Sequence, residues 1–388
     1  MALTLESVCS GLGASAEVVN FAHSAGTSVV FGEGVIAQIG ALCAGISERG
    51  KVLVVTDGGI ARAGHVDRVR PHLEAAGFEV EVFDQVHEDP TTEDVDACVE
   101  SAARAGVKVI IGLGGGSSMD TAKGCNFILT NGGEMKDYWG VGKATKKMLP
   151  FIAVPTTAGT GSECQSFALI ADAKTHQKMA CGDKKSAAAV AILDPELTLT
   201  QPSAVTAHTG IDAIAHAVET AVTAKRSEVS QAYSKLGFLL LERSFETVLA
   251  DADNLRARAE MQLGAAYAGT AIENSMLGAA HSAANPLSAH YGIIHGEAVG
   301  MMLPHVVRLN ATNEACEQIY RELYPRGLVE RLEQLLEVAG MAKPLSAYGV
   351  DPAQIPTLAS EAASQWTAQF NPVGADKGVF EALYRAAL

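Results

Sequence analysis

The first half of the chain alternates short apolar, β-branched runs with longer stretches in which apolar residues recur at helical spacing. The short runs end at Gly, Pro or Asp, as strands do. They are TSVVF (27–31), KVLVVTD (51–57), FEVEVFD (78–84), VKVIIGLGGG (107–116), LPFIAVPTT (149–157) and AVAILDP (189–195). Residues 65–77 and 92–106 show the helical pattern between them. Because strand and helix succeed one another, the pattern predicts a parallel sheet with helices on both faces.

The pattern changes near Asp194 and Pro195, after which strand-like runs disappear. Long helical patterns follow at residues 228–250 and 253–277. We therefore predict a Rossmann-like α/β domain at residues 1–195 and an all-helical domain at residues 196–388. Within the first domain, residues 1–18 form an extension placed before the first strand, a common location for loosely held sequence.

Composition narrows the class of protein. The chain has 388 residues, enough for two domains of ordinary size, and 48% of them are hydrophobic while 5% are aromatic. A formal net charge of -15 argues against nucleic acid or an anionic membrane as partner, because both need a basic face. The 7 cysteines are scattered without a C-x-x-C, which is typical of free thiols in a reducing compartment.

Signals for export or membrane insertion are missing from the sequence. The first residues lack a basic region, and Glu6 interrupts the apolar stretch that a signal peptide needs. No apolar run approaches the ~18 residues of a membrane span. We therefore expect a cytoplasmic protein. We also expect a small-molecule substrate and assembly as a homodimer or a higher homo-oligomer.

Four candidate metal ligands stand in two segments of the second half. Asp212 and His216 are four residues apart in GIDAIAHAVE, so a helix would place both on one face. His281 and His295 follow in HSAANPLSAHYGIIHG, where Pro286 and Gly292 interrupt any single helix. We expect these two histidines to come from a helix and from the turn after it. Zn²⁺ and Fe²⁺ both accept such a carboxylate and imidazole set.

Either pair alone is more often a polar helix face or a satisfied histidine than a metal site. Their occurrence in one helical half favours the metal site.

A glycine-rich loop follows the strand at residues 107–116. The sequence IIGLGGGSSMDTAK runs from an apolar strand into Gly115, Gly116 and Ser117, and then into a helix beginning near Asp120. Backbone amides in such a loop, together with a helix N-terminus, can hold phosphate oxygens. The alternative is a tight turn with no ligand. A second match, G-x-G-x-x-A at residues 32–37, is weaker because its flanks fit an ordinary strand-to-helix turn.

Two further strand ends carry polar groups that suit a dinucleotide. Asp57 ends one strand, where a carboxylate can accept both ribose hydroxyls of adenosine and repel the extra phosphate of NADP. PFIAVPTTAGTGSE ends another strand in hydroxyl side chains and free amides. Together with the glycine loop, these strand ends indicate a dinucleotide site at the carboxyl edge of the sheet.

Several of these segments, in this order, resemble the iron-containing (group III) alcohol dehydrogenase family over nearly the whole chain. The matching segments are FGEG, VVTD, GGGSSMDTAK, PTTAGTGSE, GIDAIAHAVE, HSAANPL, HG at His295 and LPHV at His305. The resemblance implies a dinucleotide-binding domain, a helical domain and a metal in the cleft between them. It also implies hydride transfer between the nicotinamide of NAD and a small alcohol or aldehyde bound to Fe²⁺, although Zn²⁺ suits the same ligands.

The resemblance assigns roles to individual residues. Asp212, His216, His281 and His295 would be the metal ligands, through which they act in catalysis, and Asp57 would hold the adenosine ribose. The remaining cofactor contacts would be Gly115, Gly116, Ser117, Thr156, Thr157, Thr160, Ser162 and Lys178. Many relatives have a histidine at the position of Asn285, near the nicotinamide, so this chain departs from them at the proton-relay position, where Asn cannot titrate. Another departure is Asp89, where relatives often have Asn.

Two other functions use similar parts. The same domain pairing resembles dehydroquinate synthase, a lyase that uses NAD and a metal. That enzyme needs basic residues for a phosphorylated, carboxylated substrate, and the segments around the metal ligands contain few Lys or Arg. A non-catalytic protein that senses NAD or stores metal is the third reading, and steady NADH turnover with an aldehyde would dismiss it.

Overall fold

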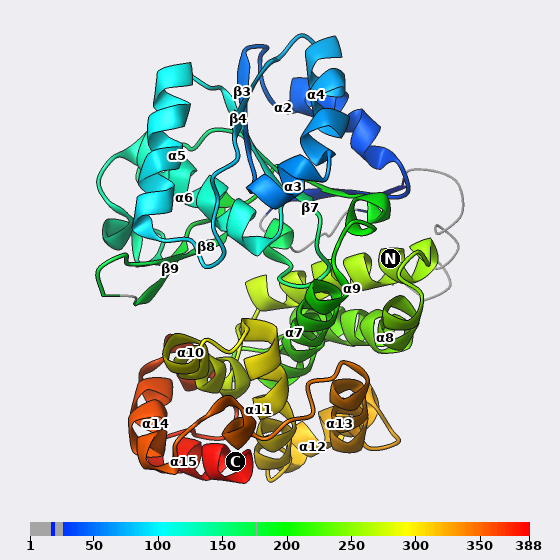
Figure 1. Cartoon of the computed structure of the whole chain (residues 1–388), viewed down its shortest axis with the longest axis vertical. Coiled ribbons are helices and arrows are strands. Elements are labelled where there is room, and N and C mark those ends of the chain that lie inside the picture. Colours follow the sequence, from blue (N-terminus) through cyan, green and yellow to red (C-terminus); the bar gives the residue numbers. More distant parts are fainter. Residues whose placement is uncertain (1–16, 20–25, 176) are drawn as a thin grey trace. The chain divides into compact units, whose positions relative to one another are not determined.

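The computed structural model describes residues 17–19, 26–175 and 177–388 (Figure 1). Cys9 and most of the predicted extension at residues 1–18 lie outside the described residues. The chain divides into two compact units. The first contains the described residues up to Thr157 together with Gly161–Gln201, and the second contains Ala158–Thr160 and Pro202–Leu388. The functional division at residues 195 and 196 stays our proposal.

A seven-stranded sheet forms the centre of the first unit, in the order β1-β2-β10-β7-β5-β3-β4. The strands are β1 (Glu17–Val19), β2 (Ser28–Phe31), β3 (Lys51–Val55), β4 (Glu79–Phe83), β5 (Val109–Gly114), β7 (Phe151–Pro155) and β10 (Val190–Leu193). The pair β1 and β2 is antiparallel, and every other pair is parallel. All the strands predicted from the sequence are confirmed, and β1 is an addition at the edge.

Helices cover both faces of this sheet, as the sequence predicts (Figure 1). Val54 on one face packs in a cluster with Leu73 of α4, whereas Leu53 on the other packs with Cys98 of α5 and Cys125 of α6. The helices are α2 (Ile39–Ile46), α3 (Gly58–Arg62), α4 (His65–Ala75), α5 (Thr92–Ala105) and α6 (Gly116–Asn131). Alternate residues of each strand therefore enter different cores, which explains the continuous apolar runs.

A second sheet of three strands, in the order β6-β9-β8, belongs to the same unit. Its strands are β6 (Gly140–Val141), β8 (Phe167–Ala171) and β9 (Lys178–Gly182). The sequence pattern does not predict this sheet, because β6 has 2 residues and β9 contains Lys, Ala and Gly, which are depleted in strands. Ala168, Ile170, Met179 and Cys181 nevertheless bury one face of the sheet against α6.

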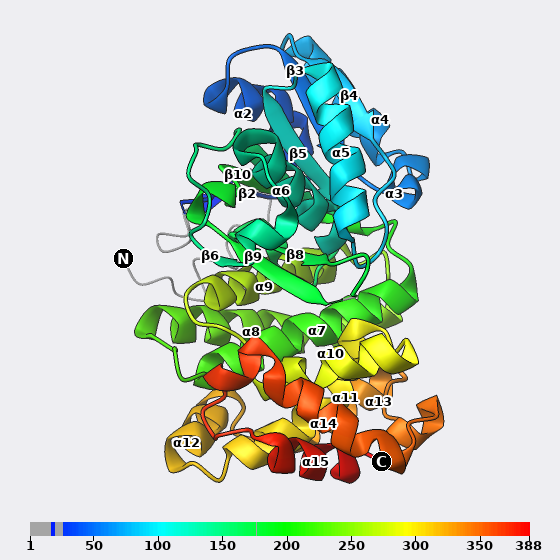
Figure 2. The same ribbon diagram turned by 90° about the vertical axis from the view of Figure 1, so that its left-hand side faces the viewer.

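All regular elements of the second unit are helices, as expected (Figure 2). They include α7 (Ser203–Val222), α8 (Glu228–Ala250), α9 (Leu255–Glu273), α10 (Ala279–Tyr291), α11 (His295–Asn310), α12 (Glu314–Leu323), α13 (Leu328–Val338), α14 (Ile355–Ser364) and α15 (Lys377–Ala386). A Cβ on Gly237 of α8 would lie 3.0 Å from the carbonyl oxygen of Gly264 on α9, so these helices approach closely because both residues lack side chains. No helix of the described chain is long and apolar enough to cross a membrane.

Three predicted boundaries were wrong. The helix after the glycine loop begins at Gly116 rather than near Asp120. Pro286 does not interrupt α10, which continues to Tyr291 and is capped by Gly292 in the left-handed conformation (φ 64). Pro286 removes one backbone donor, but Ala283, Ala284 and Leu287 around it are buried in the core and hold the helix. His295 therefore begins the next helix, α11, instead of lying in a turn.

Candidate metal centre and cofactor-binding residues

Three helices of the second unit carry the four predicted metal ligands. Asp212 and His216 are one turn apart on α7, which has 20 residues and is buried over most of its length. His281 lies in the first turn of α10, and His295 is the first residue of α11. The ligands are thus placed by helices packed in the core, which hold side chains more rigidly than loops do.

The three imidazoles converge on one carboxylate oxygen of Asp212. The Nε2 atoms of His216 and His281 each lie 3.4 Å from Oδ1 of Asp212, and Nε2 of His295 lies 3.8 Å from it. The ligand atoms of Asp212, His216 and His281 are all within 4.8 Å of one another. The rings of His216 and His281 stack with centroids 4.8 Å apart. The structure therefore brings together the predicted set of one carboxylate and three imidazoles.

Two buried atoms at the middle of this cluster are chemically unsatisfied. Oδ1 of Asp212 and Nε2 of His281 have no hydrogen-bond partner among the described residues. A buried polar atom without a partner costs stability, so protein interiors rarely leave one. A divalent cation among these atoms would satisfy both, and Zn²⁺ and Fe²⁺ both accept carboxylate oxygen and imidazole nitrogen. The residues present therefore fit the metal.

The charges of the cluster are strongly coupled. Burial raises the pKa of Asp212, but His216, His281 and His295 lower it more, so the pKa lies below its ordinary value. Burial lowers the pKa of His281, yet Glu219 and Asp212 outweigh it and raise the pKa to about 9. Burial also lowers the pKa of His216. Asp212 thus stays ionised, as a metal ligand must.

Glu219 is a functional candidate that the sequence analysis missed. Its Oε2 lies 2.6 Å from Nδ1 of His281, and the carboxylate is buried. Asp212, His216 and Glu219 are spaced by four and three residues, which places them along one face of α7. That spacing was the available signal.

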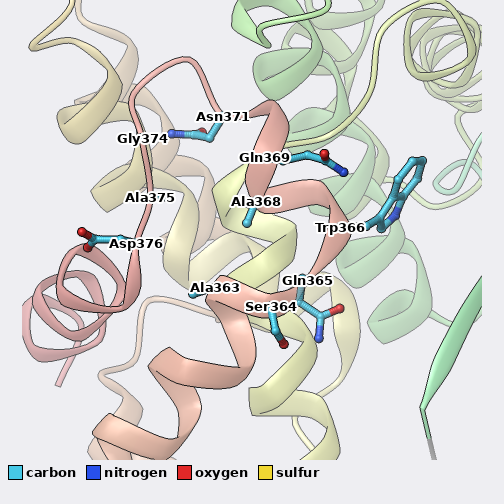
Figure 3. Close-up of a pocket in the computed structure, with 10 residues that line it drawn as sticks. All are labelled: Ala363, Ser364, Gln365, Trp366, Ala368, Gln369, Asn371, Gly374, Ala375 and Asp376. Carbon is cyan, nitrogen blue, oxygen red and sulfur yellow. The ribbon is translucent and has the colours of Figure 1, made fainter.

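Asn285, at the predicted relay position, lies one turn after His281 on α10. Its side-chain amide donates a hydrogen bond of 3.1 Å to Oε1 of Gln365. Gln365 also lines a cavity of about 550 Å³ in the second unit (Figure 3). The other lining residues are Ala363, Ser364, Trp366, Ala368, Gln369, Asn371, Gly374, Ala375 and Asp376. Asn285 is thus held by a second neutral amide.

The glycine loop has the form of a phosphate cradle. Gly115 is the N-cap of α6, a helix of 16 residues, and it has no side chain that could cap the helix. The first backbone amides of α6 can therefore donate to a phosphate group. Gly114 has φ 150, and a Cβ there would lie 2.4 Å from Oγ of Ser118. Glycine is therefore required at this turn. Gly115, Gly116 and Ser117 are half-buried beside it.

Asp57 has two roles available to it. Its Oδ1 accepts hydrogen bonds from the backbone amides of Gly59 and Ile60 and so caps α3. Its Oδ2 lies 3.8 Å from the Cβ position of Gly114, at the end of the neighbouring strand β5. One oxygen therefore supports the local fold while the other faces the glycine loop.

The threonines and serine after β7 differ in their surroundings. Oγ1 of Thr156 is buried without a hydrogen-bond partner among the described residues, and Thr157 lies 3.4 Å from the Cβ position of Gly115. The hydroxyl of Ser162 donates to Asp120 and accepts from the buried Lys123. Thr160 belongs to the short stretch assigned to the second unit. Thr157 thus contacts the glycine loop, and Thr156 offers a buried hydroxyl that a ligand could satisfy.

Lys178 forms an ion pair, and the weaker G-x-G-x-x-A match at residues 32–37 binds a carboxylate of the chain itself. Nζ of Lys178 lies 2.8 Å from Oδ1 of Asp89, which has φ 50. In the match at residues 32–37, the amides of Gly34 and Ile36 donate to the carboxylate of Asp194. An internal carboxylate thus occupies the turn at residues 32–37, so the loop after β5 remains the better phosphate site.

Comparison with known proteins covers most of the chain. The family described as iron-containing alcohol dehydrogenase matches residues 26–195, and its C-terminal domain, described as Fe-containing alcohol dehydrogenase family, matches residues 206–388. The NAD-dependent methanol dehydrogenase of Bacillus methanolicus is 34% identical over 281 residues, which cover 72% of this chain and 74% of that protein.

Solved structures of dehydrogenases and reductases are also similar to this chain. A crystal structure of 1,3-propanediol oxidoreductase is similar, with a TM-score of 0.89, 30% identity and coverage of 93% of this chain and 97% of that one. Sulfoacetaldehyde reductase from Bifidobacterium kashiwanohense, solved in complex with NAD⁺, has a TM-score of 0.85, 26% identity and coverage of 97% and 99%. The chain therefore belongs to the iron-containing alcohol dehydrogenase family and is an NAD-dependent alcohol oxidoreductase that uses a divalent metal.

Proposed function

We propose that the protein interconverts a small alcohol and its aldehyde by hydride transfer to and from NAD, with the substrate oxygen bound at the candidate metal centre. The observation that carries this proposal is the convergence of three imidazoles on the buried Oδ1 of Asp212. When bound, a divalent metal supplies a Lewis acid for the substrate oxygen, and NAD supplies the hydride carrier. Fe²⁺ is the proposed native ion, and Zn²⁺ suits the same ligands.

In this proposal, each group of residues has a separate role. Asp212, His216, His281 and His295 hold the ion. The amides around Gly115, Gly116 and Ser117 hold the diphosphate of NAD, and Asp57 accepts the ribose hydroxyls. Thr156, Thr157, Thr160, Ser162 and Lys178 contact the remaining polar groups of the cofactor. Asn285 orients its neighbours through its amide but carries no titratable proton.

The dehydroquinate synthase reading is not retained, because both parts of the chain match the iron-containing alcohol dehydrogenases. Names of similar proteins support a small substrate, since they include a methanol dehydrogenase and a 1,3-propanediol oxidoreductase. We further propose that the enzyme works in the cytoplasm as a homodimer or a higher homo-oligomer.

The direct test is a panel of short-chain aldehydes with NADH, monitored by the loss of NADH absorbance. Metal-stripped protein reloaded with Fe²⁺ or with Zn²⁺ provides the comparison. We expect turnover only in reloaded samples, with one class of small aldehyde preferred. If metal-stripped and reloaded samples oxidise NADH equally with every aldehyde, the proposed function is wrong.

A further inference from the structure

The amino end of α10, which carries His281, is capped by side chains from two distant parts of the second unit. The first amides of a helix have no partner inside the helix. Here Glu219 of α7 accepts from the amides of Gly278 and Ala280, at 3.1 and 2.7 Å. Asn371 accepts from the amide of Ala279 between them, at 3.3 Å. Three consecutive amides are thus held by two buried side chains.

The capping carboxylate also contacts the metal-ligand candidate. Oε2 of Glu219 accepts from Nδ1 of His281 at 2.6 Å. In the neutral imidazole with its proton on Nδ1, Nε2 carries the lone pair that a metal ion needs, and Nε2 lies 3.4 Å from Oδ1 of Asp212. Glu219 therefore fixes both the position of the helix end and the orientation of the imidazole upon it.

Asn371 is itself held in place. Its Nδ2 donates to Oδ1 of Asn310 at 2.8 Å and to the carbonyl of Val373 at 2.7 Å. Nδ2 of Asn310 donates back to Oδ1 of Asn371 at 3.1 Å. Because the carbonyl of Val373 can only accept, Nδ2 of Asn371 must face it, and Oδ1 of Asn371 is thereby fixed toward the end of α10.

Residues from the C-terminal part of the chain form further hydrogen bonds with α10. The hydroxyls of Ser282 and Thr367 are 2.7 Å apart, and Oη of Tyr384 donates to the carbonyl of Ala283 at 2.7 Å. Gln365, which with Asn371 lines the cavity in Figure 3, accepts from Asn285. Residues far along the chain thus fix successive turns of the helix that presents His281.

We propose that Glu219 and Asn371 are positioning residues of the metal centre, which hold α10 and the His281 imidazole in the orientation that binds the ion. This inference rests on the proposed metal centre. A cap that only stabilised the helix would leave metal affinity unchanged in any variant that folds. A positioning role instead requires that metal affinity fall in a variant without the cap, because part of the binding free energy is then used to orient His281.

The test measures the Zn²⁺ dissociation constant of metal-stripped full-length protein by competition with a chelator. In Glu219→Gln, the amide keeps the shape but loses the charge that holds Nδ1–H, and we expect binding roughly 10- to 100-fold weaker. The matched control is Glu361→Gln. Glu361 makes the same kind of contact, at 2.8 Å, with His290 on the same helix, but both side chains are exposed. We expect this control to stay within about twofold of wild type, because exposed pairs contribute little.

Asn371→Ala provides an independent arm if Glu219→Gln does not fold. It removes one acceptor at the helix end, and we expect roughly fivefold weaker Zn²⁺ binding, the factor for one neutral hydrogen bond. Folded Glu219→Gln and Asn371→Ala proteins that bind Zn²⁺ as tightly as wild type, while His281→Ala does not, would overturn this inference alone. If His281→Ala itself binds Zn²⁺ as tightly as wild type, the metal centre is wrong and the inference falls with it.

Discussion

Gly296 lies directly against the backbone of His208, where a Cβ atom would be 2.1 Å from the carbonyl oxygen. Gly296 is the second residue of α11, after His295, and His208 precedes Asp212 by one turn on α7. The backbones of the two ligand-bearing helices therefore meet at this point. A side chain between them would move His295 away from Asp212.

Gly296→Ala should therefore weaken both the fold and the metal centre. Because backbone atoms cannot give way as a flexible side chain does, we expect a loss of about 1 to 3 kcal/mol in unfolding free energy and a lower metal content. Urea unfolding and metal analysis measure the two effects. The matched control is Gly378→Ala on α15, where the nearest atom is Oδ1 of Asp376 at 3.4 Å. Equal effects of both changes would contradict the role of the contact between α7 and α11 in stability and metal binding.

Asp57→Asn should relax the preference for NADH over NADPH. Asn also caps helices, so the bonds to Gly59 and Ile60 can persist while the charge that repels a 2′-phosphate is lost. We expect the gap in kcat/KM to narrow by about 1 to 3 kcal/mol. Asp84→Asn, at the exposed end of the neighbouring strand β4, is the control and should leave the gap unchanged. An unaltered ratio in the Asp57 variant would limit Asp57 to its capping role.

Glu163 should make stability depend on pH. Burial raises the pKa of Glu163 to about 7, although its own backbone amide and Lys123 lower it. A raised carboxyl pKa adds stability that is complete below the unfolded value of about 4.5 and is lost as pH rises through about 7. We expect the stability of wild type relative to Glu163→Gln to fall by roughly 3 kcal/mol between pH 4.5 and 8. Urea unfolding across that range measures the difference, and a constant difference would contradict the assigned pKa.

Periodicity predicted the strands of the main sheet and the long helices, because the pattern of each single element is local in the sequence. The four ligand candidates were predicted from residue type, from local spacing and from the family resemblance. Other features depend on contacts between distant residues. The bond from His281 to Glu219 spans 62 residues, and the cap from Asn371 to Ala279 spans 92. The local pattern also predicted a helix break at Pro286 that does not occur, because packing around α10 compensates for one lost backbone hydrogen bond.

Asn285→His should introduce a new ionisation into catalysis. The present amide holds Gln365 and cannot titrate, whereas a histidine at this position would have a pKa near ~6.5 before any shift. We expect the variant to keep its metal and to gain an ionisation between about pH 6 and 8 in its pH-rate profile. Asn285→Gln is the control for the change in size. Superimposable profiles of wild type and Asn285→His would place residue 285 outside the proton path.

We expect Asp212, His216, His281 and His295 to bind one divalent ion together. Metal analysis of purified wild type, His281→Ala and His295→Ala, alongside circular dichroism, measures this. We expect one tightly bound ion per chain in wild type, and a loss of both metal and NADH-dependent turnover in the variants, while their helical content is retained. Variants that keep the wild-type metal content and activity would contradict the assignment.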